Sequence, residues 1–474
     1  MAVLLGVGVA AGQAPVGAWY VALPALAGLL WLVAGQLRGR VWVAVFGGAA
    51  YFAAALSWIV EPFLIDAARH GWMAPFAVVL MGFGLALFWA AAAAVSGGRV
   101  WVLAVALSAA ELARGYVLTG FPWALIGHIW IDTPVGQAAA VVGPSGLTLL
   151  TCLVAGGLSN LRVVPFVAAA LAGVWGFGAW QLAQPDPAAP GQILRLVQPN
   201  AEQAAKWDAD KAQVWFDRLM GYTAVQPAAD LVVWPETALP YLVEQHPELP
   251  GLIAAAGGGA PVAVGRQRVD GVQGWNTLTV FDPSGAVIGQ YDKHHLVPFG
   301  EYLPLGDLAF RWFGLRAFAS QAGNGYSAGP GPTVLDLGPL GKVLPLICYE
   351  AVFPQDLRGT VRPDWLLQVT NDAWFGQWTG PFQHLAQARL RAIEQGLPMA
   401  RVANTGVTAM IDARGRVVDA LPFGVAGYLD VALPGPLPAT PYARWGEAPV
   451  LLALAALAAL ALRRRRLDAS GPTA

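Results

Sequence analysis

Long apolar runs with few charged residues fill the first 182 residues of the chain. A helix needs about 20 residues to cross a bilayer core, and runs of about that length lie at 16–35, 41–60, 73–95, 99–117, 137–160, 163–182 and 447–462. The opening run, AVLLGVGVAAG, is shorter and lacks the basic leader of a signal peptide, so we interpret it as an abbreviated first helix. The pattern predicts a bundle of about eight spans, with seven in residues 1–182 and one in residues 447–466.

The pattern changes in residues 193–435, where short runs of Val, Ile, Leu and Trp alternate with turn signals. Helical periodicity is clearest at 203–220 and 383–395. Several short runs are continuously apolar, which favours an α/β domain with a largely buried sheet. The predicted strands are 193–198, 230–234, 260–266, 276–281, 342–348, 364–370, 399–404 and 408–412.

Proline-rich segments flank this α/β domain at 183–192 and 436–446. Because proline disfavours helices, we expect both segments to be extended linkers. The chain organisation is therefore a block of apolar helices, a linker, the α/β domain, a second linker, a final apolar helix and a tail at 467–474.

The composition indicates a membrane protein. Apolar residues make up 56% of the chain and charged residues 12%, and the mean hydropathy is +0.53, whereas soluble domains carry about 25% charged residues. The 20 tryptophans suit the interface between membrane and water. A net charge of -1 argues against a nucleic-acid partner, because phosphate binding needs a strong basic excess.

The distribution of arginine predicts the orientation in the membrane, because short cytoplasmic loops are enriched in Lys and Arg. The run RRRR directly follows the last apolar run, which favours a stop-transfer anchor over a nuclear-localisation signal. If all these basic sites face the cytoplasm, residues 183–446 lie on the extracytoplasmic side and the C-terminus is cytoplasmic. The basic sites are Arg38, Arg40, Arg99, Arg162 and Arg463 to Arg466.

The chain has two cysteines, which is too few for a disulfide framework or a cysteine zinc site. Cys152 lies within a long apolar run, where a thiol is a small hydrophobic group. Cys348 closes the strand-like run VLPLIC and is followed at once by Tyr349 and Glu350. Two interpretations of Cys348 stay open on these grounds, a buried core thiol and a catalytic nucleophile.

Glu236 and Lys293 also follow apolar or strand-like runs. Together with Cys348 they would divide the work of acyl transfer: the carboxylate takes the thiol proton, the thiolate attacks a carbonyl, and the ammonium stabilises the oxyanion. Each residue also has a simpler interpretation, as a loop carboxylate, an exposed lysine or a core thiol.

His294 and His295 suggest a Cys–His pair, but neighbours on a strand point to opposite faces, so at most one could serve. We expect structural or substrate-side roles for both histidines. We expect no metal or other cofactor, because the candidate site lacks a cluster at metal-ligand spacing.

Several motifs, taken in order, resemble the bacterial apolipoprotein N-acyltransferase family, whose extracytoplasmic domain belongs to the nitrilase superfamily. They are ELARGYVLTGFPW (111–123), KWD (206–208), WPE, DKHHLVPFGEYLP, ICYE and NDAWFG. The resemblance implies a nitrilase-like αββα sandwich and a Glu–Lys–Cys triad with Glu236 as general base, Lys293 as oxyanion-stabilising residue and Cys348 as nucleophile. Further functional positions implied by the family are Trp207, Glu301, Tyr349 and Glu350.

The resemblance also implies the reaction. The family moves an acyl chain from a membrane phospholipid, through a cysteine thioester, to the α-amino group of the N-terminal diacylglyceryl-cysteine of an apolipoprotein. The expected partners are that phospholipid, the apolipoprotein and the bilayer, and the expected location is the bacterial inner membrane. The alternatives are a membrane-tethered nitrilase or amidase and a non-catalytic membrane scaffold.

The segment 305–320 carries several large apolar side chains and few polar ones. It is either an amphipathic core helix or a lid that dips into the membrane interface to admit lipid.

Overall fold

The computed structural model describes residues 1–203, 209–303, 325–358 and 361–469. Trp207 and the segment 305–320 therefore lie outside the described residues. The chain forms two compact units, and some segments far apart in sequence belong to the same unit. The helical unit contains residues 1–185, 378–386 and 439–474, and the α/β unit contains residues 186–377 and 387–438.

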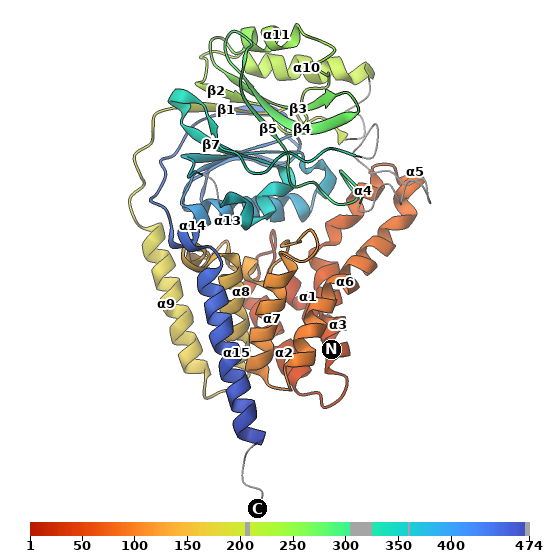
Figure 1. Ribbon diagram of the computed structural model, residues 1–474, viewed down its shortest axis with the longest axis vertical. Helices are drawn as coiled ribbons and strands as arrows, with labels where there is room; N and C mark the ends of the chain where they lie inside the picture. Colours follow the sequence, from red (N-terminus) through yellow and green to blue (C-terminus); the bar gives the residue numbers. More distant parts are fainter. Residues whose placement is uncertain (204–208, 304–324, 359–360, 470–474) are drawn as a thin grey trace, which may run out of the picture. The chain divides into compact units, whose positions relative to one another are not determined.

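The helical unit has a helix in every run in which a span is predicted (Figure 1). Ala, Leu, Val and Trp make up most of these helices, and their few charged residues include Glu111 and Arg114 on α7 and the run Arg463 to Arg466 at the end of α15. They are α1 (Ala2–Ala10), α2 (Trp19–Ala34), α3 (Arg40–Ala55), α6 (Ala74–Val95), α7 (Val100–Arg114), α8 (Ala139–Leu158), α9 (Val164–Leu182) and α15 (Ala448–Ala469). Shorter helices are α4 (Glu61–Leu64), α5 (Ala67–His70) and α14 (Pro441–Trp445).

Not every apolar helix is long enough to cross a membrane by itself. Three segments of the described chain have the necessary length and hydropathy, namely Ala67–Val95, Pro134–Leu158 and Val164–Leu182. A fourth span exists if Arg40–Ala55 and Ser57–Leu64, which are bent by 67° at their junction, are counted together. The helix α2 has 16 residues and α7 has 15, which is below the length of about 20 that a full span takes.

The motif ELARGYVLTGFPW forms a buried polar network in the helical unit. Arg114 and Glu111 are fully buried one helical turn apart, and their side chains form an ion pair of 2.6 Å. Trp89 donates its indole N–H to the Glu111 carboxylate at 2.8 Å. Arg114 also donates to the carbonyl oxygens of Phe121 and of Trp123, the latter at 2.9 Å. The network therefore fixes the loop that follows α7.

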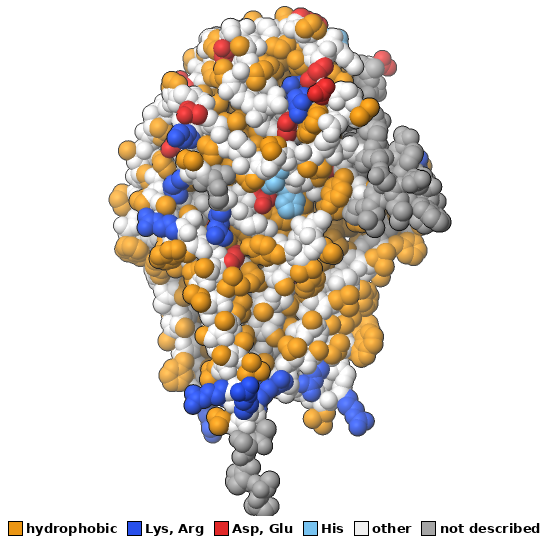
Figure 2. Space-filling model, viewed as in Figure 1, with side chains coloured by type: hydrophobic (Ala, Val, Ile, Leu, Met, Phe, Trp, Pro, Cys, Tyr) orange, Lys and Arg blue, Asp and Glu red, His pale blue; other side chains and the backbone are white. Residues whose placement is uncertain are grey.

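Several of the predicted basic sites lie at the same end of the helical unit. Figure 2 shows Lys and Arg side chains gathered at the end of the helices near which the chain terminates. Arg465, at the end of α15, donates to the carbonyl of Val95 at 3.0 Å, and Gly98, which follows Val95 in the next loop, lies beside Arg40. The loops after α2 and α6 and the end of α15 thus form one basic face.

The α/β unit is built on two six-stranded sheets. Residues in the central strands are mostly apolar and buried on both sides, because each sheet is covered on both faces. The strand order of the first sheet is β12 (Gly427–Ala432), β1 (Ile193–Gln198), β2 (Leu231–Val233), β3 (Val262–Asp270), β4 (Gln273–Phe281) and β5 (Val287–Asp292). That of the second is β11 (Val417–Leu421), β10 (Thr408–Ile411), β9 (Met399–Ala403), β8 (Trp365–Thr370), β7 (Lys342–Ile347) and β6 (Leu335–Asp336).

The two sheets repeat one topology. In each, a parallel core of three strands, β1–β2–β3 or β7–β8–β9, is extended by antiparallel neighbours. The inner faces of the sheets meet through β1 and β9 and through β4 and β7. Helices α10 (Ala209–Thr223) and α11 (Leu249–Ala256) cover the first sheet, and α13 (Gly380–Gln395) covers the second (Figure 1). The result is an αββα sandwich.

All eight predicted strands are present, with ends displaced by a few residues at most. The predicted helices are also found, as α10 and α13. The strands β5, β6, β11 and β12 were not predicted from the pattern, because they lie toward the sheet edges and expose many of their residues.

Candidate functional site

The strands place Glu236, Lys293 and Cys348 in the turns that follow their C-terminal ends. Glu236 lies three residues after β2, Lys293 directly follows β5, and Cys348 directly follows β7. Gly265 on β3 allows the first of these turns to pack closely, because a Cβ there would overlap the carbonyl of Pro235. The polar site therefore forms where the buried strands end.

Lys293 is the centre of a buried charge cluster. Its Nζ lies 2.9 Å from Oε1 of Glu301 and 3.4 Å from Oε1 of Glu236. The three side chains are at most 8% exposed. One ammonium therefore serves two carboxylates in an environment where charges interact strongly.

Backbone and side-chain amide groups also donate hydrogen bonds to the two carboxylates. Asn276, on β4, donates to Glu236 at 2.6 Å and to Glu301 at 3.2 Å. The backbone N–H of Asn371 donates to Oε2 of Glu236 at 2.8 Å, and that of Val297 donates to Oε2 of Glu301 at 2.8 Å. Asn276 was missed in the sequence, where a single polar residue in a strand gives no local signal of function.

Cys348 has a conformation unlike that of a core thiol. Its φ is +53°, a left-handed value that costs a non-glycine residue about 1 to 3 kcal/mol. It begins the 3₁₀ turn Cys348–Val352, and Gln368 donates to its carbonyl at 3.2 Å. Cys152, in contrast, is fully buried within the apolar helix α8. The chain thus leaves the extended conformation of β7 at Cys348.

The electrostatics keep the thiol protonated and the lysine charged. Burial raises the pKa of Cys348, and the Glu236 carboxylate raises that pKa further, while Lys293 and a hydrogen bond with Thr370 lower it. Burial alone would lower the pKa of Lys293, but Glu301 and Glu236 outweigh it and raise that pKa above its usual value. The thiol therefore needs a base to ionise. Among the carboxylates, Glu236 has the largest effect on the pKa of Cys348.

Glu350 joins the segments that carry Lys293 and Cys348. Its side chain is fully buried, and Oε1 accepts from the backbone N–H of His294 at 2.8 Å and from the Tyr291 hydroxyl at 2.9 Å. Oε2 accepts from the backbone N–H of Ile347 at 2.7 Å. Tyr349 is buried beside it, with its ring edge-on to Phe353. Glu350 therefore holds the two segments together through buried hydrogen bonds and is not a solvent-exposed charge.

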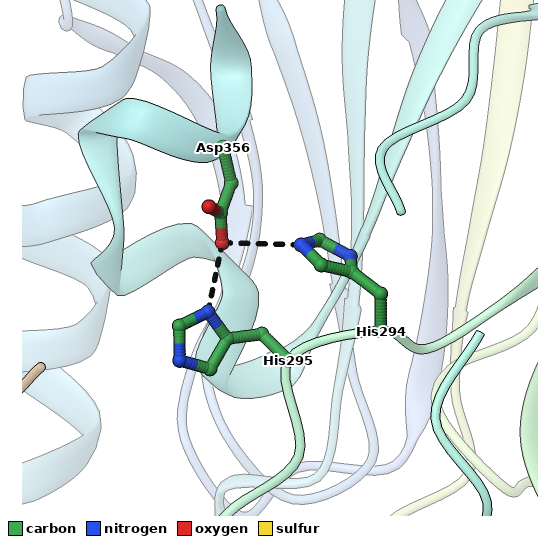
Figure 3. Close-up of side chains that lie close together, drawn as sticks. All are labelled: His294, His295 and Asp356. Atoms are coloured by element: carbon green, nitrogen blue, oxygen red, sulfur yellow. Dashed lines mark hydrogen bonds and ion pairs between the residues drawn. The ribbon is translucent and has the colours of Figure 1, made fainter. Parts of the chain in front are cut away.

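His294 and His295 both turn toward Asp356, as Figure 3 shows. The prediction that they point to opposite faces is wrong, because β5 ends at Asp292 and the two histidines lie in a loop. Asp356 follows His295 by 61 residues, so sequence spacing gave no sign of this group. Ligand atoms of the three side chains lie within 4.8 Å of one another, which makes them a possible metal-binding group.

The carboxylates around His294 control its protonation. Burial alone would lower the pKa of His294, but Asp356 and Glu350 outweigh burial and raise the pKa to about 9. The same contacts with His294 and His295 hold the pKa of Asp356 below its usual value, against the effect of burial. In the absence of a metal ion, the group is therefore an imidazolium held between carboxylates.

Comparison with known proteins identifies both parts of the chain. Residues 183–442 match the carbon-nitrogen hydrolase family, and residues 5–157 match the apolipoprotein N-acyltransferase N-terminal domain. A solved carbon-nitrogen hydrolase superfamily protein from Xanthomonas campestris is 21% identical, with a TM-score of 0.39, and the match covers 51% of this chain and 90% of that protein.

Relatives named apolipoprotein N-acyltransferase match over nearly the whole chain. The relative from Caulobacter vibrioides is 38% identical, with 94% of this chain and 91% of the relative covered. The relative from Rhodopseudomonas palustris is 37% identical, with 98% of this chain and 95% of the relative covered. Identity at this level over both units means that the chain belongs to the apolipoprotein N-acyltransferase family.

Proposed function

We propose that the protein transfers an acyl chain from a membrane phospholipid to the α-amino group of the N-terminal diacylglyceryl-cysteine of an apolipoprotein, through a thioester on Cys348. The observation that carries the proposal is the buried Glu236–Lys293–Glu301 cluster, whose charges act on the thiol of the strained Cys348. Family membership supports the choice of substrates.

In the first half-reaction, Glu236 takes the thiol proton and the thiolate attacks the ester carbonyl of the phospholipid. The Lys293 ammonium and the backbone N–H of Tyr349 stabilise the oxyanion. The C–O bond to the glycerol backbone then breaks, and the leaving alkoxide takes the proton from Glu236. The products are a thioester on Cys348 and a lysophospholipid.

In the second half-reaction, the α-amino group of the apolipoprotein attacks the thioester carbonyl and Glu236 accepts a proton from the nitrogen. The C–S bond breaks, and the thiolate of Cys348 recovers that proton from Glu236. The products are an amide and the free enzyme. Glu301 and Asn276 hold Lys293 and Glu236 in place, since each contacts the cluster directly.

Three further positions have supporting roles in this proposal. Glu350 holds the Lys293 segment against the turn of Cys348 through its backbone hydrogen bonds. Trp207 positions substrate, and a role of the segment 305–320 in admitting lipid is the alternative to its being part of the core; both lie outside the described residues. A lid at 305–320 would make the double substitution Trp312→Ser and Phe313→Ser reduce phospholipid use more than stability, whereas unfolding would identify a core helix.

The thioester is tested by mass spectrometry. Purified full-length protein in detergent is incubated with phospholipid alone and digested, and the peptide around LPLICYEAVF is weighed. We expect an added acyl mass on Cys348 that neutral hydroxylamine removes and that a diacylated lipoprotein peptide discharges onto its amine. Discharge only by water would favour a hydrolase, and turnover with unmodified Cys348 would exclude the covalent mechanism. Loss of activity in a folded Cys348→Ala variant would exclude a non-catalytic scaffold, and retained activity would contradict Cys348 as the nucleophile.

The proposed location is the bacterial inner membrane, because both substrates carry acyl chains anchored in a bilayer. In this arrangement residues 1–182 supply seven membrane helices and residues 447–466 the eighth. Residues 193–435 form the catalytic domain on the extracytoplasmic side, between linkers at 183–192 and 436–446, and the tail at 467–474 is cytoplasmic. The shared basic end of the helices supports this orientation.

Cysteine labelling tests the orientation. In a background with both native cysteines replaced by alanine, a cysteine at Ala188, which is exposed, should react with a membrane-impermeant thiol reagent in intact spheroplasts. A cysteine at Ser470 should react only after the membrane is permeabilised. The reverse pattern would overturn the orientation.

A further inference from the structure

We propose that His294, His295 and Asp356 form a binding site for a divalent transition-metal ion, with Zn²⁺ as the best fit. The site lies between two segments of the α/β unit. One segment carries Lys293, and the other is the 3₁₀ turn Pro354–Leu357, which follows the turn of Cys348. The metal ion ties these segments together and takes no part in acyl transfer.

The distances among the ligand atoms suit a small cation. Oδ2 of Asp356 lies 3.0 Å from Nδ1 of His295 and 3.3 Å from Nε2 of His294 (Figure 3). In a tetrahedral zinc site with bonds of about 2.0 to 2.1 Å, ligand atoms are about 3.3 Å apart. Two imidazole nitrogens and a carboxylate oxygen are also ordinary zinc ligands. The ion therefore fits with only small movements of the side chains.

The surroundings of His294 prepare one ring nitrogen as a ligand. Nδ1 lies 2.7 Å from Oε1 of Glu350 and 2.8 Å from the Tyr291 hydroxyl. In the neutral ring the Glu350 carboxylate holds the proton on Nδ1, as second-shell carboxylates do at metal-ligating histidines, and leaves the lone pair on Nε2. Nε2 is buried and faces Oδ2 of Asp356, 3.3 Å away. In the neutral ring its lone pair points toward a carboxylate oxygen, and a cation between the two atoms would be bound by both.

Packing fixes the ring of His295. The ring of His295 stacks on Phe353, with centroids 3.5 Å apart and planes inclined by 18°. That stacking sets the direction in which Nδ1 of His295 points. The side chains of His294, His295 and Asp356 are 14%, 19% and 14% exposed. Partial exposure gives the ion a path of entry and leaves room for water as a fourth ligand.

An imidazolium–carboxylate cluster is the alternative account of the same contacts. It joins the same two segments through the hydrogen bond between His295 and Asp356, so the site keeps its shape without metal. For that reason we expect EDTA to leave acyl transfer intact. The two accounts differ in whether the protein binds a metal ion, which is measurable without any assay of activity.

The test uses full-length protein in detergent, stripped with EDTA and dialysed free of metal. Titration with Zn²⁺ in competition with a chromogenic chelator should give one bound ion per chain. Zn²⁺ should also raise the melting temperature. Co²⁺ in place of Zn²⁺ should give the visible absorption of a four-coordinate nitrogen and oxygen site, without a thiolate charge-transfer band.

Matched variants locate the ion. His295→Gln and Asp356→Asn should each weaken Zn²⁺ binding by about 100-fold, because losing a ligand exceeds the 10- to 100-fold cost typical of second-shell changes. His246→Gln is the control, since His246 pairs with Glu248 at 3.2 Å on the surface and should keep full binding. Cys348→Ala should also bind normally. Absence of stoichiometric binding to the native protein, or equal binding by the native protein and a folded Asp356→Asn variant, would overturn the proposal.

Discussion

The helical unit and the α/β unit each bury a group of charges, but the two groups are balanced differently. In the helical unit, one carboxylate, Glu111, pairs with one guanidinium, Arg114. The remaining donors of Arg114 go to carbonyl oxygens of the following loop. In the α/β unit, one ammonium, Lys293, is shared by Glu236 and Glu301. One group is neutral as a whole, and the other carries an excess negative charge.

This difference separates a structural network from a reactive one. A balanced, hydrogen-bonded pair in an apolar environment has no reason to exchange protons, and removing either partner leaves an uncompensated charge. Lys293 neutralises only one of the two carboxylates that it contacts, so one negative charge is left to act on the surroundings. The charge of Glu236 raises the pKa of the nearby Cys348 thiol. A carboxylate this close to the thiol can accept its proton and so act as a general base.

The largest expected effect comes from Glu236→Gln. Glutamine keeps the size of the side chain and can still accept from Asn276, but it cannot take the thiol proton. Because general bases contribute up to about 10⁴-fold, we expect acyl transfer, measured with a diacylated peptide acceptor, to fall by about that factor. The melting temperature should change little, because the substitution removes one of two like charges.

Asp282→Asn is a matched control for Glu236→Gln. It also removes one carboxylate charge from the α/β unit, but the side chain caps an exposed turn through Ser284. We expect it to retain full activity. An equal loss of activity in both variants, or an active Glu236→Gln, would contradict the assignment of Glu236 as the base.

Arg114→Gln should have its effect on stability. It leaves Glu111 buried without a countercharge and removes donors from the loop carbonyls, and breaking a buried pair costs about 3 to 5 kcal/mol. The expected result is a large fall in the free energy of unfolding in detergent, with activity lost only in proportion to the unfolded fraction. The double variant Glu111→Gln with Arg114→Gln should recover part of the stability. No recovery would mean that the loop contacts, rather than the charge, decide the effect.

The sequence predicted the buried parts of the fold better than the exposed ones. Mostly apolar runs identified the central strands, such as β1 and β8, because strands buried on both faces are rich in apolar residues. The strand β5 was missed because three of its six residues are exposed and only one is buried, so its sequence resembles a loop. Apolar runs also identified the helices of the other unit, but not their lengths, since α2 and α7 end earlier than the runs do.

The site, like the fold, could be predicted only where a local sequence pattern marks its residues. Glu236 and Cys348 stand at the ends of predicted strands, whereas Lys293 follows β5, a strand that the pattern missed. Asn276 and Asp356 reach the site from positions that no local pattern distinguishes, so only the folded arrangement associates them with it. The histidines were misjudged because they were treated as neighbours on a strand, whereas β5 ends at Asp292 and both lie in the loop that follows.

The smallest expected effect concerns the pKa of Cys348. It distinguishes an effect of the charge of Glu236 from an effect of the shape of its side chain. The charged Glu236 raises the pKa of Cys348, because a nearby negative charge disfavours the thiolate. In Glu236→Gln that opposition is absent, so the pKa falls and alkylation of Cys348 by iodoacetamide should begin at a pH lower by at least about one unit. The rate is followed by mass spectrometry of the Cys348 peptide, with the Cys152 peptide as internal reference.

The variant would then hold a more acidic thiol and yet transfer acyl groups far more slowly, which a purely structural role of Glu236 does not explain. An unchanged pH profile would mean that the carboxylate exerts no charge effect on the thiol, and the contrast between a balanced group and a reactive one would lose its electrostatic basis.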